Sequence, residues 1–259
     1  MPYADLHVHT TRSDGSLELE AVPDAARLAD VSVVALTDHD RLQPFDEPVI
    51  ERDGVTILHG VELRVEAASG LRVDLLGYGV TPAPELEAAF SELQENRRER
   101  GRAIVDAVEE RLEIDLEVTV DTGFGRPHVA RAIDSHPGTE YDYEGAFTHL
   151  IGNEGPCFVP REIPSFDYGR RLLTDHCTLV SLAHPLRYPD MDAALELAAD
   201  CDAIELHYPY GRDVDLEPVE RAIDDHGLLA TGGSDAHDDR LGVAGLSKEE
   251  YRHLLLPSR

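Results

Sequence analysis

The sequence predicts an α/β fold in which a parallel sheet or barrel is interrupted by a mostly helical insertion. Short apolar runs alternate with amphipathic segments over residues 1–82, and the alternation returns over residues 171–259. Strands that alternate with helices in this way are typical of parallel α/β architectures. Residues 83–170 differ, because helix and loop signals dominate there. The length of 259 residues suits one large domain with such an insertion.

The first half of the expected barrel contains one helix and several strands. Leu17–Ala29 carries apolar residues on one face and predicts a helix, and Pro23 indicates that its first turn begins nearby. The β-branched run Val31–Leu36 predicts a strand that is buried on both faces. Two further strands are expected at Val55–Leu58 and Arg72–Leu76.

The insertion begins with a long charged amphipathic pattern, and the barrel pattern follows it. Glu85–Leu112 predicts either one helix or two helices that separate near Gly101. The returning alternation predicts strands at Thr178–Leu182, Ala203–Leu206 and Leu228–Thr231, and helices at Met191–Ala199 and Val219–His226. The sequence therefore divides into a barrel made of residues 1–82 and 171–259 and a helical insertion of residues 83–170.

The charge of the chain is strongly acidic. Its 23 Lys and Arg residues face 52 Asp and Glu residues, which gives a net charge of -29, and Lys248 is the only lysine. At 1 M salt the Debye length is about 3 Å, so the self-repulsion of such a surface is screened. We expect a halophilic, haloarchaeal source; an ordinary acidic cytosolic protein is the alternative. The sequence has no basic stripe that could bind duplex DNA. Small anionic substrates can still bind if metal ions and a few arginines make the local field positive.

The cysteine spacing and the lack of a secretory pattern lead us to expect a cytoplasmic protein. The three cysteines have no Cys-x-x-Cys spacing, so neither a disulfide framework nor a thiolate zinc site is indicated. The sequence shows no secretory signal pattern and no run of about 18 apolar residues. We expect a soluble protein in the cytoplasm, and the sequence leaves its oligomeric state open.

Polar metal-binding side chains gather at the ends of the predicted strands. His7 and His9 point to the same side of a strand because side chains alternate, and Asp14 follows in a polar turn. Two surface histidines with a turn aspartate are the alternative for this motif alone. The strand-end candidates are His7, His9, Asp38, His39, Glu62, Asp74, His184, Glu205, Asp235 and His237. In parallel α/β folds such ends surround one site, and these donors exceed what a single four-coordinate ion uses.

Seven short motifs together resemble a known family. They are His-x-His with a following Asp-Gly, Thr-Asp-His, Gly-Val-Glu, Leu-Leu-Gly-Tyr-Gly, Gly-Arg-Pro-His, Ala-His-Pro and Gly-Ser-Asp-Ala-His. In this order they are similar to the PHP (polymerase and histidinol phosphatase) superfamily. The stand-alone enzymes that resemble nucleoside 3',5'-bisphosphate phosphatases and 5'-to-3' oligoribonucleotide exonucleases match best.

The resemblance implies a distorted (β/α)7 barrel with up to three metal ions. It implies that the first ion is held by His7, His9, Glu62 and Asp235, the second by Glu62 as a bridge with Asp74 and His128, and the third by Asp14, His39 and His237. Asp74 departs from the family pattern, which commonly has histidine there. A carboxylate can still bind Mn²⁺ or Mg²⁺. Two to three divalent ions are expected, Mn²⁺ first, with Zn²⁺, Fe²⁺ and Mg²⁺ as alternatives.

The chemistry expected of this site is hydrolysis of a phosphate ester. Metal ions bridged by Glu62 lower the pKa of a bound water, and the resulting hydroxide attacks phosphorus. Arg126 and His184 are expected to hold phosphate oxygens, and His184 can alternatively protonate the leaving oxygen. Asp38 is expected to orient a ligand histidine.

The expected substrate is a 3',5'-bisphosphorylated nucleoside or the 5' end of short RNA. Two alternatives stay open. A histidinol-phosphate phosphatase would use the same site with another pocket, and a non-catalytic PHP module would bind metal for structure alone.

Overall fold

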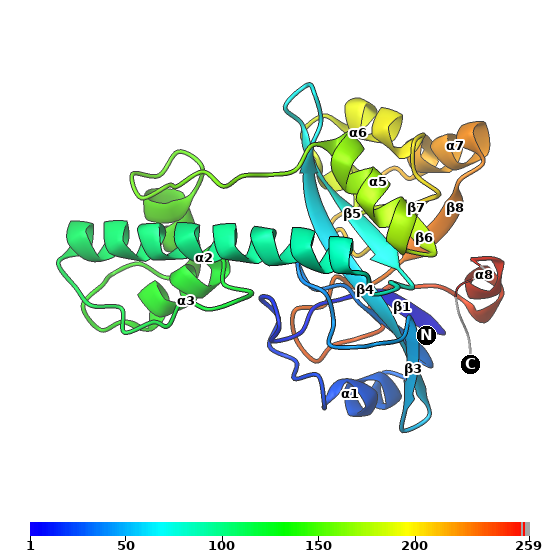
Figure 1. The fold of residues 1–259 in the computed structure, drawn as a ribbon, viewed down its shortest axis with the longest axis horizontal. Coiled ribbons are helices and arrows are strands. Elements are labelled where there is room, and N and C mark those ends of the chain that lie inside the picture. The colour runs from blue at the N-terminus through cyan, green and yellow to red at the C-terminus, as the bar shows by residue number, and fades with distance from the viewer. Residues whose placement is uncertain (255, 257–259) are drawn as a thin grey trace. The chain divides into compact units, whose positions relative to one another are not determined.

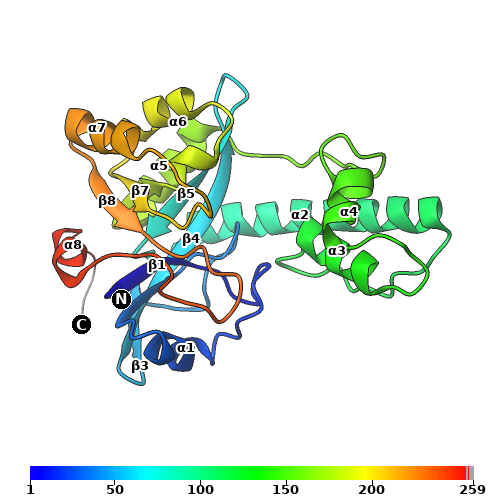
Figure 2. The same cartoon turned by 180° about the vertical axis from the view of Figure 1, so that it is seen from behind.

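A computed structural model of the chain describes residues 1–254 and 256. The described residues form two compact units, one made of Met1–Ala88 with Ile163–Arg259 and the other of Ala89–Glu162. We call them the barrel unit and the helical unit and describe each by itself (Figures 1 and 2).

The barrel unit is built on one curled, eight-stranded sheet (Figure 1). Its strands are β1 (Ala4–Val8), β2 (Val33–Leu36), β3 (Val49–Arg52), β4 (Val55–Glu66), β5 (Arg72–Tyr78), β6 (Leu179–Leu182), β7 (Ala203–His207) and β8 (Leu229–Gly232). The order is β1-β2-β4-β5-β6-β7-β8, with β3 paired to β4 at the side. The sheet closes on itself, since the His9 amide donates to the Ala236 carbonyl (2.9 Å) just after β8. The prediction of a distorted α/β barrel is confirmed.

The pairing of β4 and β5 differs from the expected parallel arrangement. β5 runs antiparallel to both β4 and β6. β4 does not end at Leu58 but continues for eight more residues, to Glu66. It continues because Val61, Leu63 and Val65 are fully buried and keep the period-two pattern of a strand. Glu62 therefore lies inside a strand and not at its end.

Helices cover the outside of the barrel unit. They are α1 (Val22–Leu28), α5 (Phe166–His176), α6 (Met191–Ala198), α7 (Glu217–His226) and α8 (Lys248–His253), with a short 3₁₀ turn at Pro185–Arg187. α1 begins at the proline, as expected from Pro23. In both views α5, α6 and α7 lie along β5 to β8 (Figures 1 and 2), and Leu6, Leu58 and Leu76 are among the buried core residues on the strands.

The helical unit is organised around α2 (Pro84–Leu112), which begins in the barrel unit. α2 passes through Gly101 without a break, so one helix replaces the alternative of two. A Cβ at Gly101 would lie 2.7 Å from the Phe124 ring, so glycine permits this close approach. The unit also contains α3 (Arg126–Ser135), α4 (Tyr143–Ala146) and a π-helical turn (Phe147–Ile151). Among the described residues, no helix combines the length and apolar character that crossing a membrane requires.

Candidate metal centre

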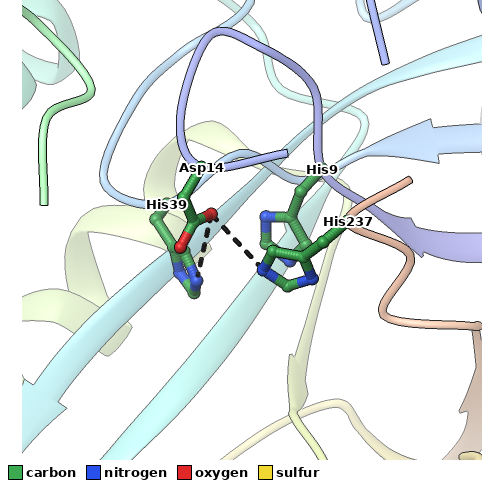
Figure 3. A group of neighbouring side chains, drawn as sticks. All are labelled: His9, Asp14, His39 and His237. Atoms are coloured by element: carbon green, nitrogen blue, oxygen red, sulfur yellow. Dashed lines mark ion pairs between the residues drawn. The ribbon is translucent and has the colours of Figure 1, made fainter. Parts of the chain in front are cut away.

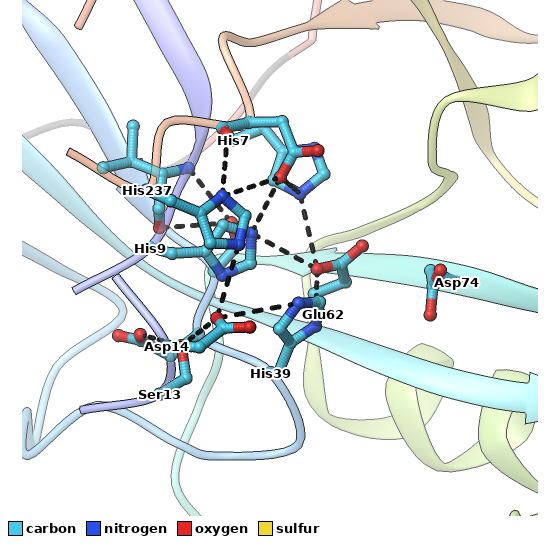
Figure 4. A network of polar contacts seen from close by, with 12 residues as sticks. His7, His9, Ser13, Asp14, His39, Glu62, Asp74 and His237 are labelled. Atoms are coloured by element: carbon cyan, nitrogen blue, oxygen red, sulfur yellow. Dashed lines mark hydrogen bonds and ion pairs between the residues drawn. The ribbon is translucent and has the colours of Figure 1, made fainter. Parts of the chain in front are cut away.

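His7 and His9 lie at the end of β1 and are fully buried. Leu6 and Val8 point into the apolar core, so the alternation of the strand turns both imidazoles to the other side. His7 Nδ1 lies 3.1 Å from Glu205 Oε1. When the imidazole is neutral and Nδ1 donates to this carboxylate, Nε2 is the nitrogen left to bind an ion, and it faces Glu62 and Asp235 (Figure 4).

Two carboxylate oxygens, one from Glu62 and one from Asp235, each lie close to both histidines. Glu62 Oε2 lies 3.5 Å from His7 Nε2 and 3.3 Å from His9 Nε2. Asp235 Oδ1 lies 3.4 Å from His7 Nε2 and 3.1 Å from His9 Nε2. Ligand atoms around a four-coordinate ion with bonds of about 2.0–2.1 Å are about 3.3 Å apart. The separations thus match the edges of a metal coordination shell.

The hydrogen bonding of these atoms supports the same conclusion. His7 Nε2, both ring nitrogens of His9 and Glu62 Oε2 are buried and have no hydrogen-bond partner among the described residues. Leaving buried polar atoms unpaired is costly, so such a group calls for a ligand. Neutral imidazoles and carboxylates are the donors that Zn²⁺, Mn²⁺ and Fe²⁺ accept, and the residues therefore fit a divalent ion.

A second group of donors adjoins the first (Figure 3). It consists of His9, Asp14, His39 and His237. Asp14 Oδ1 lies 3.3 Å from His237 Nε2 and 3.8 Å from His39 Nε2. His39 Nδ1 lies 2.8 Å from Glu62 Oε2, which connects the two groups. The two groups also share His9.

Asp38 fixes the loop that carries Asp14. Its carboxylate accepts hydrogen bonds from the Thr10 amide (2.8 Å), the Thr10 hydroxyl (2.7 Å), Ser13 Oγ (2.5 Å) and Gln43 Nε2 (2.7 Å). The loop from Thr10 to Asp14 therefore folds over the buried Asp38 carboxylate. The expectation that Asp38 orients a ligand histidine stays a prediction.

The segment after β8 is held against β1 by close backbone packing. A Cβ at Gly233 would lie 2.3 Å from the His7 amide nitrogen, so only glycine fits there. The buried Asp5 carboxylate accepts from the Ser234 amide (2.9 Å) and the Gly242 amide (2.8 Å). Asp235 follows with φ 50, a left-handed conformation that is uncommon outside glycine. Backbone strain of this kind gathers at functional sites.

The charges within the cluster are strongly coupled. Burial alone would lower the pKa of His7, but neighbouring carboxylates, above all Glu205, raise that pKa well above its usual value. Burial would raise the pKa of Asp235, yet His7 and His9 hold it well below the usual range. The pKa of Asp14 is lowered in the same way, against the effect of burial, by His39 and His237. The carboxylates are therefore ionised, as metal ligands must be.

His184 and Asp74 lie on the other side of Glu62. His184 Nε2 is 3.2 Å from Glu62 Oε1 and 3.8 Å from Asp74 Oδ2. Its amide donates to Glu205 Oε2 (2.8 Å), and its backbone has φ 29. Asp74 binds Arg64 through both carboxylate oxygens, with Nε–Oδ1 at 2.7 Å and Nη2–Oδ2 at 2.5 Å. The group around Asp74 thus contains His184 and Glu62.

A pocket opens over the cluster. Its volume is about 380 Å³, within the size range of small-molecule sites. Its charged lining residues are Asp14, Glu62, Asp74 and Asp235 together with Arg64, Arg72 and Arg187. With neutral histidines the lining carries one net negative charge, which two divalent ions would turn into a net charge of +3. A site in an acidic protein can in this way attract an anion.

Arg126 and His128 belong to the helical unit, at the start of α3. Arg126 Nη1 donates to the Asn153 side chain (2.9 Å) and the Ile151 carbonyl (3.2 Å). His128 Nδ1 accepts from the Gly125 amide (3.1 Å) and the ring stacks on Phe124. Phosphate binding by Arg126 and metal binding by His128 stay predictions.

Three further residues contact the donors, and none of them was assigned a role from the sequence. Glu205, named above as a polar strand end, contacts both His7 and the His184 backbone. Tyr208 donates to Asp235 Oδ2 (2.8 Å). Arg187 Nη1 donates to the same oxygen (3.0 Å). Only the polar end of β7 gave a signal in the sequence, and it pointed to Glu205.

A curled α/β barrel with buried imidazole and carboxylate donors at its strand ends defines a metal-dependent hydrolase. Comparison with known proteins gives the family. The PHP domain matches residues 5–125. A phosphoribosyl 1,2-cyclic phosphate 1,2-diphosphodiesterase of Eggerthella lenta is 30% identical over 247 residues, which cover 90% of this chain and 93% of that protein. The chain belongs to the PHP domain family and is a metal-dependent phosphoesterase of that type.

Other relatives and solved structures agree. A 3',5'-nucleoside bisphosphate phosphatase of Chromobacterium violaceum is 29% identical to this chain, and the alignment covers 92% of this chain and 88% of that protein. A 5'-3' exoribonuclease of Haemophilus influenzae is 28% identical, and the alignment covers 71% of this chain and 69% of that protein. A Bifidobacterium adolescentis protein described as a metal-dependent phosphoesterase has the same fold, with a TM-score of 0.78, 24% identity and coverage of 97% of this chain and 95% of its own.

Proposed function

We propose that this chain hydrolyses a phosphate ester of a small nucleotide, with a 3',5'-bisphosphorylated nucleoside as the favoured substrate and the 5' end of short RNA as the next. One observation carries this proposal. Buried donor atoms of His7, His9 and Glu62 lie unpaired against the Asp235 carboxylate, beside a pocket that three arginines line.

The metal assignment is part of the proposal. One ion would be held by His7, His9, Glu62 and Asp235, and a second by His9, Asp14, His39 and His237, with Glu62 beside His39. Mn²⁺ is the favoured ion because the donors mix imidazole with several carboxylates. When bound, divalent ions polarise the phosphoryl oxygens and lower the pKa of the attacking water.

The side chains of the chain itself position these groups and the substrate. Glu205 holds His7 so that Nε2 faces the ion. Arg187 reaches the pocket from the turn after β6, and its fork can contact oxygens of an anionic substrate. His184 also lines the pocket, and we propose that it holds a phosphate oxygen or protonates the leaving oxygen.

The choice of substrate rests on the pocket and the relatives. Arginines reach the pocket both from the β4–β5 hairpin and from the turn after β6, which suits a substrate with two anionic groups. The relatives named as a nucleoside bisphosphate phosphatase and an exoribonuclease support this choice. A cyclic phosphodiester of a phosphorylated sugar is the second candidate, because the Eggerthella lenta relative of that activity matches 90% of the chain.

A substrate panel tests the proposal. Phosphate release or ring opening is measured with Mn²⁺ at high salt on adenosine 3',5'-bisphosphate, a short 5'-phosphorylated RNA, phosphoribosyl 1,2-cyclic phosphate and histidinol phosphate. We expect the highest kcat/KM for the bisphosphate and complete loss with a chelator. Asp235→Asn should abolish turnover, whereas Asp238→Asn, a change in the same segment outside the donor groups, should not.

Other outcomes select the alternatives. Preference for histidinol phosphate would identify a histidinol-phosphate phosphatase. Bound metal without hydrolysis of any of the four substrates would identify a non-catalytic PHP module. Each of these results contradicts the proposal.

A further inference from the structure

Asp74 occupies a position at which the family resemblance implies a metal ligand, yet its carboxylate is already bound. Arg64 and Asp74 are direct cross-strand partners in the antiparallel β4–β5 ladder. The Arg64 guanidinium takes both carboxylate oxygens, with Nε–Oδ1 at 2.7 Å and Nη2–Oδ2 at 2.5 Å. The Asp74 side chain is 1% exposed. An ion at this place would have to displace a bidentate, buried guanidinium.

The contrast with the neighbouring donors is clear. His7 Nε2, His9 Nε2 and Glu62 Oε2 are buried without hydrogen-bond partners among the described residues. The other donor near Asp74 is His184 Nε2, which lies 3.2 Å from Glu62 Oε1. In the group of Glu62, Asp74 and His184, it is the Asp74 carboxylate that is already occupied, because Arg64 takes both of its oxygens.

Arg64 retains hydrogen-bonding capacity toward the pocket. A guanidinium has five N–H donors, and the Asp74 pair uses one on Nε and one on Nη2. The described residues give Nη1 no hydrogen-bond partner, and the side chain is 42% exposed where it lines the pocket with Glu62 and His184. The Nη1–Nη2 edge can therefore accept a second bidentate anion.

We propose that Arg64, held by Asp74, replaces the further metal ion, so that the chain binds two ions and uses this guanidinium to bind a phosphate oxygen of the substrate. The proposal deepens the proposed function and rests on it for the identity of the substrate. Arg64 supplies a fixed positive charge beside Glu62 that no chelator removes. It serves specificity and orientation, because a guanidinium does not coordinate water as a metal ion does.

The test measures metal content and phosphate affinity, neither of which needs turnover. Wild-type protein is equilibrated with excess Mn²⁺ and desalted, and bound metal is counted by elemental analysis. Inorganic phosphate binding is measured by calorimetry on the metal-loaded protein. The variant Arg64→Gln/Asp74→Asn removes both charges but keeps a hydrogen-bonding pair. The control Arg27→Gln/Asp24→Asn does the same to the exposed ion pair of α1.

We expect two ions per chain in the wild type and in both variants. Phosphate affinity should fall about 10–100-fold in the Arg64 variant, as for loss of charge-assisted hydrogen bonds, and should not change in the control. Three ions in the wild type, or an unchanged phosphate affinity in the Arg64 variant, would overturn the proposal. Two ions with an Arg64-dependent phosphate affinity but no turnover of any substrate would refute only the proposed function.

Discussion

Glu205→Gln tests how the buried cluster is held together. Glu205 is fully buried, and its two oxygens each accept one hydrogen bond, from His7 Nδ1 at 3.1 Å and from the His184 amide at 2.8 Å. A glutamine offers one acceptor oxygen and turns its NH₂ group toward the other donor. One buried donor then stays unpaired, and His7 loses the carboxylate that fixes its tautomer.

The magnitude follows from the loss of such a supporting group. Removing the partner of a ligand histidine lowers metal affinity about 10–100-fold, which corresponds to about 1.4–2.8 kcal/mol. The Mn²⁺ affinity is measured by competition with a fluorescent chelator. Glu196→Gln, on the exposed side of α6, is the matched control. A folded Glu205→Gln protein whose Mn²⁺ affinity lies within about twofold of wild type would refute the reasoning.

Four further predictions follow from the same structure. Asp14→Asn should bind one ion fewer than wild type and lower kcat at least about tenfold, because Asp14 lies between His39 and His237. Unchanged metal content would contradict this. Burial lowers the pKa of His59 to about 4, so the unfolded chain binds more protons between pH 4 and 6.5 and stability falls as the pH drops through this window. Between pH 6.5 and 4, the free energy of urea unfolding should change less in metal-free His59→Gln than in the metal-free wild type, by at most about 3 kcal/mol. An equal change in the two proteins would exclude the effect. Arg126→Ala should lower kcat/KM at least about tenfold with the metal content unchanged, and wild-type rates would remove Arg126 from substrate binding. Thermal stability should rise with KCl from about 0.1 to 1 M as the net charge of -29 is screened, and a fall would contradict the halophilic interpretation.

Much of the fold follows from patterns that are local in the sequence. The runs at Val31–Leu36 and Thr178–Leu182 became β2 and β6 with small changes at their ends. The direction of β5 did not follow, because a period-two pattern is the same in parallel and antiparallel strands. The end of β4 was misplaced because Glu62 is a polar residue in a strand whose apolar neighbours continue the pattern.

The candidate site shows a similar division. The His-x-His motif and the polar strand ends predicted which side chains gather, since parallel strands share one rim. The partners of those side chains depend on register between distant strands. Arg64 meets Asp74 only because the β4–β5 ladder sets them opposite each other, and Asp38 meets Ser13 only through the fold of a loop. These pairings therefore cannot be predicted from the local sequence.

The most direct test of the account is a metal titration followed by two readouts in the same samples. Metal-free protein is titrated with Mn²⁺, and bound ions and phosphate release from adenosine 3',5'-bisphosphate are both recorded. If the buried donors of the barrel unit form the catalytic metal centre, hydrolysis is absent without metal and rises with the ions bound until the sites are filled. Full hydrolysis in the chelator-treated protein, or hydrolysis that does not change as ions bind, would contradict the account.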